Sequence, residues 1–131
     1  MKNLIQRYYD VFNSGDREDL LKMLSDDIVH EINEGGVEIG REAFRKFLER
    51  MDRCYEEQVE ELIVFNNDNP NRAAAEFFIR GKYVATDDGL PEASGQNYHL
   101  RIGAFFEITN GKISRITNYY NLAEWLRMVG A

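Results

Sequence analysis

Apolar residues recur at the three- and four-residue spacing of an amphipathic helix in four segments of the chain. The four helices are expected at 2–13, 16–24, 40–55 and 121–130. The first should end at the sequence "NSGD" and the second at residues 25–27. Asp16 and Asn121 each stand where an N-cap residue would begin the following helix.

Segments rich in β-branched and aromatic residues, bounded by Asn, Asp, Gly or Pro, predict strands. They lie at 28–32, 37–39, 58–65, 73–85, 97–109 and 112–120. The turn "NEGG" at 33–36 joins the first two, and "TNGK" at 109–112 is a tight hairpin turn. The longer segment "TDDGLPEASGQ" is expected to be a loop of the kind that borders a binding site.

Helices that flank a run of long strands predict an α+β fold, in which the helices pack on one face of a sheet. We expect a cone-shaped α+β barrel, with the helices on a strongly curved antiparallel or mixed sheet that encloses a pocket. The open end of such a cone suits a small apolar molecule. At 131 residues the chain is expected to form a single domain, 1–131.

The charge pattern argues against two classes of partner. A formal net charge of −7 disfavours nucleic acid, whose phosphates require a concentrated basic surface. No apolar run approaches the roughly 18 residues that cross a membrane, so no membrane partner is expected. Cys54 is the only cysteine, which excludes an intramolecular disulfide and indicates a reducing compartment such as the cytoplasm.

The sequence also lacks the motifs of bound metals and phosphates. Two histidines and one cysteine do not provide the ligand spacing of a metal site, and there is no glycine-rich phosphate loop. We therefore expect neither a metal nor a cofactor.

Four stretches, in this order, carry a resemblance to a known superfamily. They read "RYYDVFNSGD", "LLKMLSDDIVHEI", "IGREAFRKFL" and "GKISRITNYYNL". Over nearly its whole length the chain resembles the nuclear transport factor 2-like superfamily; its first half is most similar to the ketosteroid isomerases and its second half to the SnoaL-type polyketide cyclases. The resemblance implies the fold but not the reaction, because this fold serves enzymes, ligand binders and interaction modules alike.

The resemblance can be followed residue by residue. Tyr8 falls on the oxyanion-hole tyrosine of the isomerases, whereas Ile32 falls on their general-base aspartate. Their second oxyanion donor, a protonated aspartic acid, falls on Gly103 or Ala104, and the proton-transferring aspartate of the cyclases falls on Asn121. A hydrocarbon cannot abstract a proton and an amide cannot shuttle one. Authentic steroid isomerase activity is therefore not expected, and Asn121 is interpreted as a helix cap.

His30 is the candidate that replaces the missing base. Because strand residues alternate between faces, His30 and Ile32 share one side while Glu31 lies on the other. If Ile32 occupies the base position, His30 points into the same pocket, where an imidazole can act as acid or base near neutral pH. A shift of one residue would turn Glu31 inward instead. We prefer His30 and Tyr8 as the catalytic pair, although either could be a buried residue of the core.

Other residues are expected to form the walls of the pocket. The isomerase alignment turns these side chains toward the pocket, with the last as a lid: Ile32, Phe77, Ile79, Tyr83, Ile116, Asn118, Tyr120 and Trp125. His99 and Arg101 share one face of the strand 97–109. If that face is concave, Arg101 can hold a carboxylate or enolate and His99 can relay a proton; if not, both belong to a solvent-exposed or dimer surface.

Three functions remain open at this point. The first is an isomerase- or cyclase-like enzyme that enolises a small apolar carbonyl compound, with Tyr8 as oxyanion donor, His30 as base and Asn118 orienting the substrate. The second is a ligand-binding module without turnover. The third is an interaction domain whose cone is filled by its own side chains. We expect a homodimer formed through the sheet, because the long strands carry more apolar residues than one face can bury.

Overall fold

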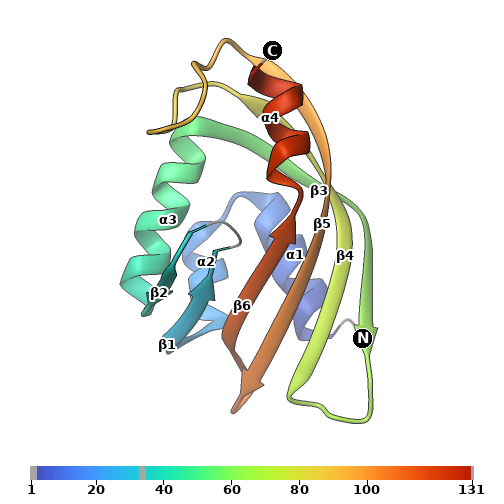
Figure 1. The fold of residues 1–131 in the computed structure, drawn as a ribbon. Helices are drawn as coiled ribbons and strands as arrows, with labels where there is room; N and C mark the ends of the chain where they lie inside the picture. Colours follow the sequence, from blue (N-terminus) through green and yellow to red (C-terminus); the bar gives the residue numbers. More distant parts are fainter. Residues whose placement is uncertain (1–2, 33–34, 131) are drawn as a thin grey trace.

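The computed structural model describes residues 3–32 and 35–130. It contains a six-stranded, strongly curved sheet and four helices (Figure 1). The helices are α1 (Leu4–Ser14), α2 (Arg17–Lys22), α3 (Arg41–Cys54) and α4 (Leu122–Gly130). The strands are β1 (Leu24–Glu31), β2 (Val37–Ile39), β3 (Tyr55–Asn66), β4 (Arg72–Tyr83), β5 (Gln96–Thr109) and β6 (Lys112–Tyr120). Within the described ranges, no helix has the length and apolar character needed to span a membrane.

The sheet is mixed and open. Its strand order is β2-β1-β6-β5-β4-β3, and β1 runs parallel to β6 while the other neighbours are antiparallel. The two edge strands, β2 and β3, do not pair with each other, so the expected cone is a curved sheet rather than a closed barrel. A bulge contributes to the bend: Glu61 has a positive φ of 55°, where the register of β3 against β4 shifts.

The first three helices cover the concave face of the sheet (Figure 1), with α3 against β1 and α1 against β3. Helix α4 packs along β5. Ile5 of α1 and Leu20 of α2 are buried in the same hydrophobic core as the sheet residues Phe106 and Ile116. Each such side chain contributes about 1.5–3 kcal/mol through the area it removes from water. This layer of helices and the curved sheet are the two walls between which the site lies.

The expected helix ends are confirmed where a cap defines them. Gly15 ends α1 in the left-handed conformation, with φ 84°, which glycine adopts without steric cost. The Asp16 carboxylate accepts a hydrogen bond from the Asp19 amide at 3.0 Å, and the Asn121 side chain accepts one from the Glu124 amide at 3.0 Å. The cap interpretation of Asn121 is therefore confirmed. Lys2 and the turn residues 33 and 34 lie outside the described residues.

Two element boundaries were predicted wrongly. Residues 24–27 belong to β1, not to the end of α2, because Leu24 pairs with Ile113 of β6 and a register shift then separates it from Val29. Strand β3 begins at Tyr55, directly after α3, although the sequence indicated residue 58. The second difference matters for the site, since it places residues 55–57 in the sheet.

Candidate functional site

A cavity of about 290 Å³ lies between the concave face of the sheet and the helices. This volume is at the lower end of the range for small-molecule sites, about 300–1,000 Å³. Most of its wall is apolar, and the apolar residues that sequence reasoning did not propose for it include Phe12, Phe44, Phe47, Leu48, Met51, Val59, Leu90, Leu100, Ile102 and Leu122. The cone is thus not filled by its own side chains. No cluster of three or more His, Cys, Asp or Glu that could hold a metal ion occurs among the described residues.

His30 of β1 lies in the wall of this cavity and is only 3% exposed. Its ring packs against those of Phe44 and Phe47 of α3, with centroids 4.9 and 4.5 Å away. Glu31 points to the opposite face of the sheet, where its carboxylate lies 3.3 Å from the guanidinium of Arg115. Of the two alternatives left by strand alternation, the structure therefore has His30 inward.

Glu38 is the charged neighbour of His30. The two residues are paired across β1 and β2, and His30 Nδ1 lies 3.5 Å from Glu38 Oε1. Both atoms are buried, and neither has a hydrogen-bond partner within the described part of the chain. Burial lowers the pKa of His30 from 6.5; the Glu38 carboxylate opposes this effect and the Arg50 guanidinium adds to it. The imidazole is therefore neutral at pH 7, which is the form that accepts a proton.

Tyr8 of α1 lines the same cavity. Its ring is buried edge-on against Tyr9 and Phe106, with centroids 5.0 and 6.1 Å away. The Tyr8 hydroxyl makes no hydrogen bond to another residue that the structure describes. Burial raises the pKa of Tyr8 above its usual range, and the nearby Arg17 only partly opposes this. The phenol therefore keeps its proton and can donate it in a hydrogen bond to an oxygen in the cavity.

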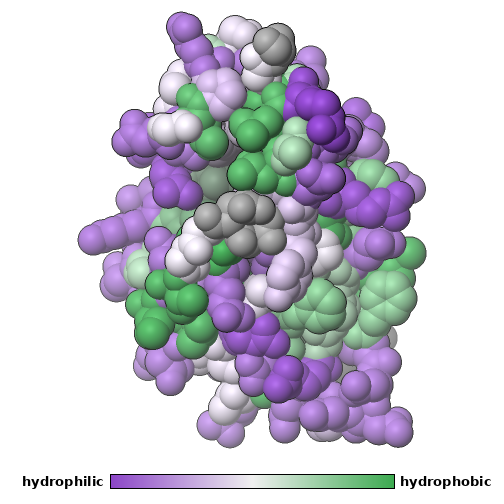
Figure 2. All heavy atoms as spheres, viewed as in Figure 1, coloured by the Kyte–Doolittle hydropathy of each residue, from purple (hydrophilic) through white to green (hydrophobic). Residues whose placement is uncertain are grey.

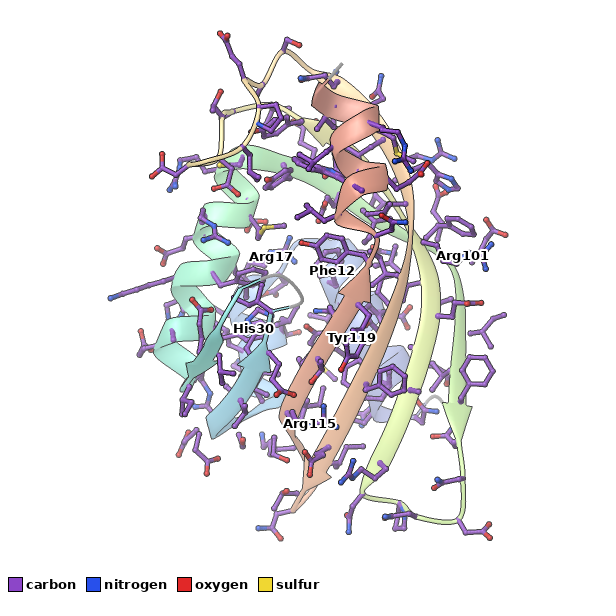
Figure 3. The ribbon with its side chains drawn as sticks, viewed as in Figure 1. Phe12, Arg17, His30, Arg101, Arg115 and Tyr119 are labelled. Carbon is purple, nitrogen blue, oxygen red and sulfur yellow. The ribbon has the colours of Figure 1, made fainter. Side chains whose placement is uncertain are left out.

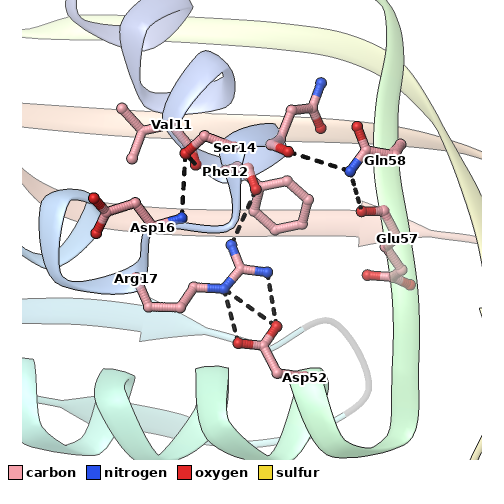
Figure 4. Close-up of polar contacts among 9 residues, drawn as sticks. Val11, Phe12, Ser14, Asp16, Arg17, Asp52, Glu57 and Gln58 are labelled. Atoms are coloured by element: carbon pink, nitrogen blue, oxygen red, sulfur yellow. Dashed lines mark hydrogen bonds and ion pairs between the residues drawn. The ribbon is translucent and has the colours of Figure 1, made fainter.

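Arg17 is held in the cavity wall by two other residues (Figure 4). Its Nη2 lies 2.7 Å from Asp52 Oδ1 and its Nε lies 2.9 Å from Asp52 Oδ2, while Nη1 donates to the Phe12 carbonyl at 3.1 Å. This two-pronged contact fixes the guanidinium and pairs its charge. Arg17 therefore forms a fixed cationic part of the wall near Tyr8.

Glu57 and Tyr98 form a second polar group in the wall, and Gly81 makes their contact possible. Glu57, Gly81 and Tyr98 are in register across β3, β4 and β5. The Tyr98 ring lies over Gly81, where an added Cβ would be 2.1 Å from Tyr98 Cζ. The Tyr98 hydroxyl donates to Glu57 Oε2. Loss of hydration raises the pKa of Glu57 by more than Tyr98 and Arg17 lower it.

The loop between β4 and β5 supplies a third polar group. Asp87 lines the cavity, accepts a hydrogen bond from the Tyr55 hydroxyl at 2.9 Å and lies 3.7 Å from Nε of Arg50. Tyr83, which was expected in the cavity wall, instead holds this loop. Its hydroxyl accepts from the Asp87 amide at 3.0 Å and donates to the Pro91 carbonyl at 2.6 Å.

Most of the residues proposed from the sequence line the cavity. They are Tyr8, His30, Ile32, Phe77, Ile79, Ile116, Asn118, Tyr120 and Trp125. Asn118 lines the cavity, and its side chain makes no hydrogen bond to any described residue. Trp125 packs edge-on against Tyr98, with ring centroids 5.9 Å apart.

His99 and Arg101 do not reach the cavity, because Tyr98, Leu100 and Ile102 occupy the inward positions of β5. The His99 ring stacks on Phe78 at 4.5 Å, and the Arg101 guanidinium lies 4.7 Å from the same ring. Figure 3 shows Arg101 outside the sheet, away from His30. Their expected role in substrate binding has no support in this geometry.

The polar residues of the wall that were not proposed from the sequence include Arg17, Arg50, Asp52, Glu57, Asp87 and Tyr98. Glu57 was missed because the strand was expected to begin after it. One available signal was Gly81 within the apolar pattern of β4, since a glycine inside a strand often marks the close approach of another group.

Comparison with known proteins agrees with this fold. The model of the SnoaL-like domain matches residues 5–116. A candidate polyketide cyclase from Pseudomonas putida KT2440 is 48% identical, with a TM-score of 0.95 over 96% of this chain and 95% of that chain. A second, from Silicibacter sp. TM1040, is 44% identical, with a TM-score of 0.96 over 98% of this chain and 93% of that chain.

More distant structures share the fold alone. An NTF2-like protein from Burkholderia xenovorans LB400 is 17% identical, with a TM-score of 0.76 over 96% of this chain and 92% of that chain. No protein of curated function matches the chain. The match of the domain model and the two relatives above 40% identity establish that the chain belongs to the SnoaL-like family and has the NTF2-like fold.

Proposed function

We propose that this protein binds a small apolar carbonyl compound in the cavity and catalyses its enolisation, as an isomerase or cyclase does. The observation that carries the proposal is the pairing of two groups in one apolar cavity: a buried, neutral imidazole and a phenol with no protein partner among the described residues. The first can accept a proton and the second can stabilise negative charge on oxygen.

In this reaction His30 is the general base. Because Nδ1 faces Glu38, Nε2 is the nitrogen available to the ligand. It takes a proton from the carbon next to the carbonyl, and the electron pair of that C–H bond moves into the enolate. The Glu38 carboxylate lies close to the imidazolium that results, and it stabilises this charge.

Tyr8 and Asn118 act on the substrate oxygen and on its orientation. The Tyr8 hydroxyl donates a hydrogen bond to the carbonyl oxygen, and this bond strengthens as the oxygen becomes negative. The Asn118 amide has no hydrogen bond to another described side chain or backbone group, which suits contact with a second oxygen of the substrate.

The names of related proteins suggest the finer reaction. Two relatives above 40% identity are described as candidate polyketide cyclases, and in a cyclase the enolate carbon would attack a second carbonyl of the same molecule. We propose this ring closure as the finer form of the activity. The single buried Cys54 also suits action in a reducing cytoplasm.

A ligand-binding module without turnover is the second candidate. It is favoured by Ile32, which lines the cavity where the isomerases carry their general base, and by the absence of their second acidic group at Gly103 and Ala104. In that case Tyr8 and Asn118 would hold a carbonyl compound, and His30 would serve only the packing.

Deuterium exchange separates the two candidates. Acetophenone, a small apolar ketone, is incubated with the protein in D₂O, and loss of its methyl proton signal is followed by NMR. We expect exchange with the wild-type protein, and its loss with His30→Gln but not with His99→Gln, which changes the histidine of the outer face. Binding of acetophenone without any exchange above the buffer rate would contradict the enzymatic proposal and support the binding module.

A further inference from the structure

Glu57 is an ionisable group of the cavity wall that has no role in the proposed enolisation. It comes from β3 at one edge of the sheet, whereas His30 comes from β1, and strands β6, β5 and β4 separate the two. Because the sheet is curved, both side chains nevertheless border one cavity. The cavity therefore has two separate positions at which a proton can be exchanged.

The local structure holds the Glu57 carboxyl in one place. Tyr98 donates to Oε2 from across the intervening strand, and it can do so only because Gly81 leaves room for its ring. Val59 lies on the same strand and face as Glu57. The Asn13 side chain accepts a hydrogen bond from the Val59 amide at 2.8 Å and donates one to the Val59 carbonyl at 2.9 Å. The position of the Glu57 carboxyl thus depends on three strands: β3 carries it, β5 supplies the Tyr98 donor, and β4 leaves room for the Tyr98 ring at Gly81.

The surroundings of Glu57 favour its neutral form. Arg17, the cation whose charge acts on Glu57, is itself paired with Asp52 at 2.7 Å. The remaining neighbours are Tyr98, a neutral phenol, and the Asp52 carboxylate, which repels a second negative charge. The pKa of Glu57 is accordingly raised while that of His30 is lowered. Environments that displace two pKa values in these opposite directions are the pattern by which acid and base roles are divided between two groups.

We propose that Glu57 is a second catalytic residue, a neutral carboxylic acid that delivers a proton to a substrate oxygen while His30 removes one from carbon. The inference rests on the proposed function. The substrate it implies is an apolar molecule with a carbonyl group and a second oxygen, such as a β-hydroxy ketone.

For such a substrate the step is a dehydration. His30 Nε2 takes the proton from the carbon between the two oxygen functions, and the C–H electron pair forms a C=C bond as the C–O bond of the hydroxyl breaks. The Glu57 proton goes to the departing oxygen, which leaves as water. The imidazolium and the carboxylate that remain return to their starting forms by exchange with solvent water.

The protonation state of Glu57 can be tested without a substrate. Infrared difference spectra between the wild type and Glu57→Gln at pH 7 should contain the C=O band of one protonated carboxylic acid. The matched control is Glu56→Gln, since Glu56 is the adjacent residue of β3 and is exposed on the outer face; its difference spectrum should contain only carboxylate bands. A carboxylate difference spectrum for Glu57→Gln would overturn the proposal.

The catalytic role is tested with the aldol adduct of acetone and benzaldehyde, whose dehydration gives the ultraviolet-absorbing benzylideneacetone. We expect Glu57→Gln to lose about 100-fold or more of the dehydration rate, the range typical for a general acid, and Glu56→Gln to lose none. Deuterium exchange of acetophenone, which needs only the base and the oxyanion donor, is measured beside it on the wild type.

The two proposals fail in different ways. If the wild type dehydrates the adduct no faster than Glu57→Gln does, or not at all, while its deuterium exchange is intact, the role of Glu57 alone is overturned. Absence of exchange in the wild type would contradict the proposed function, whereas the infrared result would still decide whether the cavity holds a neutral carboxylic acid.

Discussion

Gly81 lies directly under the ring of Tyr98, so close that a Cβ at this position would stand 2.1 Å from Tyr98 Cζ and 2.4 Å from its hydroxyl oxygen. The missing side chain allows a tyrosine of β5 to cross β4 and to reach Glu57 of β3. One glycine thus determines both the shape of the cavity wall and the environment of its carboxyl group.

Gly81→Ala should destabilise the protein, because the methyl group forces the Tyr98 ring and the strand backbone apart. Overpacking of this kind costs about 1–3 kcal/mol, which chemical denaturation measures. In the background of Tyr98→Ala the same substitution should cost much less, because the ring that it meets is gone. An equal cost in both backgrounds would show that the contact between Gly81 and Tyr98 is not the cause.

Tyr8→Phe should leave the fold intact and weaken the binding of a carbonyl group. The net value of a hydrogen bond, about 0.5–1.5 kcal/mol, corresponds to a loss of about 2- to 10-fold in the affinity for acetophenone. Ethylbenzene, which has no oxygen, should bind both proteins equally. Tyr119→Phe, on the exposed outer face, is the control. Loss of thermal stability without any change in affinity would assign Tyr8 to the core alone.

Glu38→Gln should lower the pKa of His30 further, because the Glu38 carboxylate is the group that raises it. The chain has two histidines, so His99→Gln assigns the ring signals in an NMR titration. Glu56→Gln, at the opposite edge of the sheet, should leave the titration of His30 unchanged. If Glu38→Gln also leaves it unchanged, the 3.5 Å contact between the two side chains does not act on the imidazole.

Glu57 should make the protein less stable as the pH rises. Its pKa in the folded protein lies above the unfolded value of 4.5, so its stabilising contribution is complete below pH 4.5 and is lost as the pH rises through the folded pKa. Each pH unit between the two pKa values corresponds to about 1.4 kcal/mol. The groups that face the carboxyl are Tyr98, Arg17 and Asp52.

This dependence is measured as the difference in free energy of unfolding between Glu57→Gln and the wild type, in which the contribution of His30 cancels. The variant should gain in relative stability between pH 4.5 and pH 8. A difference that stays constant over this range would show that the carboxyl ionises equally easily in the folded and unfolded chains.

The outer face of the sheet should form a homodimer. Apolar side chains gather among hydrophilic ones over the strands from β5 to β3 in Figure 2. Ile63, Phe65, Phe105 and Tyr119 of this face are 46–54% exposed, and the rings of Phe105 and Tyr119 are in contact at 5.7 Å. Pairing of two identical patches would be two-fold symmetric.

Phe105→Glu should shift the protein to the monomer in sedimentation at micromolar concentration, because it places a charge within the patch. Ile39→Glu, an exposed position on β2, should not. A wild-type monomer of 15.3 kDa would contradict the proposed dimer.

The sequence and its resemblance to a known superfamily were sufficient for the order of the elements and for nine of the residues that line the cavity. Alternation along β1 put His30 and Ile32 on one face, and capping residues indicated where α1 ends and α4 begins, because both signals are local. That the face of His30 is the inward one came from the resemblance to the isomerases. Strand alternation could not decide which face of β5 is concave, since each face carries large residues. Which face is concave depends on how the sheet curves around the helices. In the structure the concave face is the one that carries Tyr98, so His99 and Arg101 lie outside the site.

The polar part of the wall depends on contacts between distant segments. Glu57 and Tyr98 are 41 residues apart, and Arg17 meets Asp52 across 35 residues. No local pattern specifies such pairs, although the glycine in β4 did mark the place where one of them forms.

The most direct measurement of the central claim is the pH dependence of acetophenone deuterium exchange, set beside the NMR titration of His30 in the same protein. If neutral His30 is the base, the exchange rate rises with pH, reaches half of its plateau at the pKa of His30, and shifts with that pKa in Glu38→Gln. An exchange rate whose midpoint does not follow the titration of His30 would contradict the account.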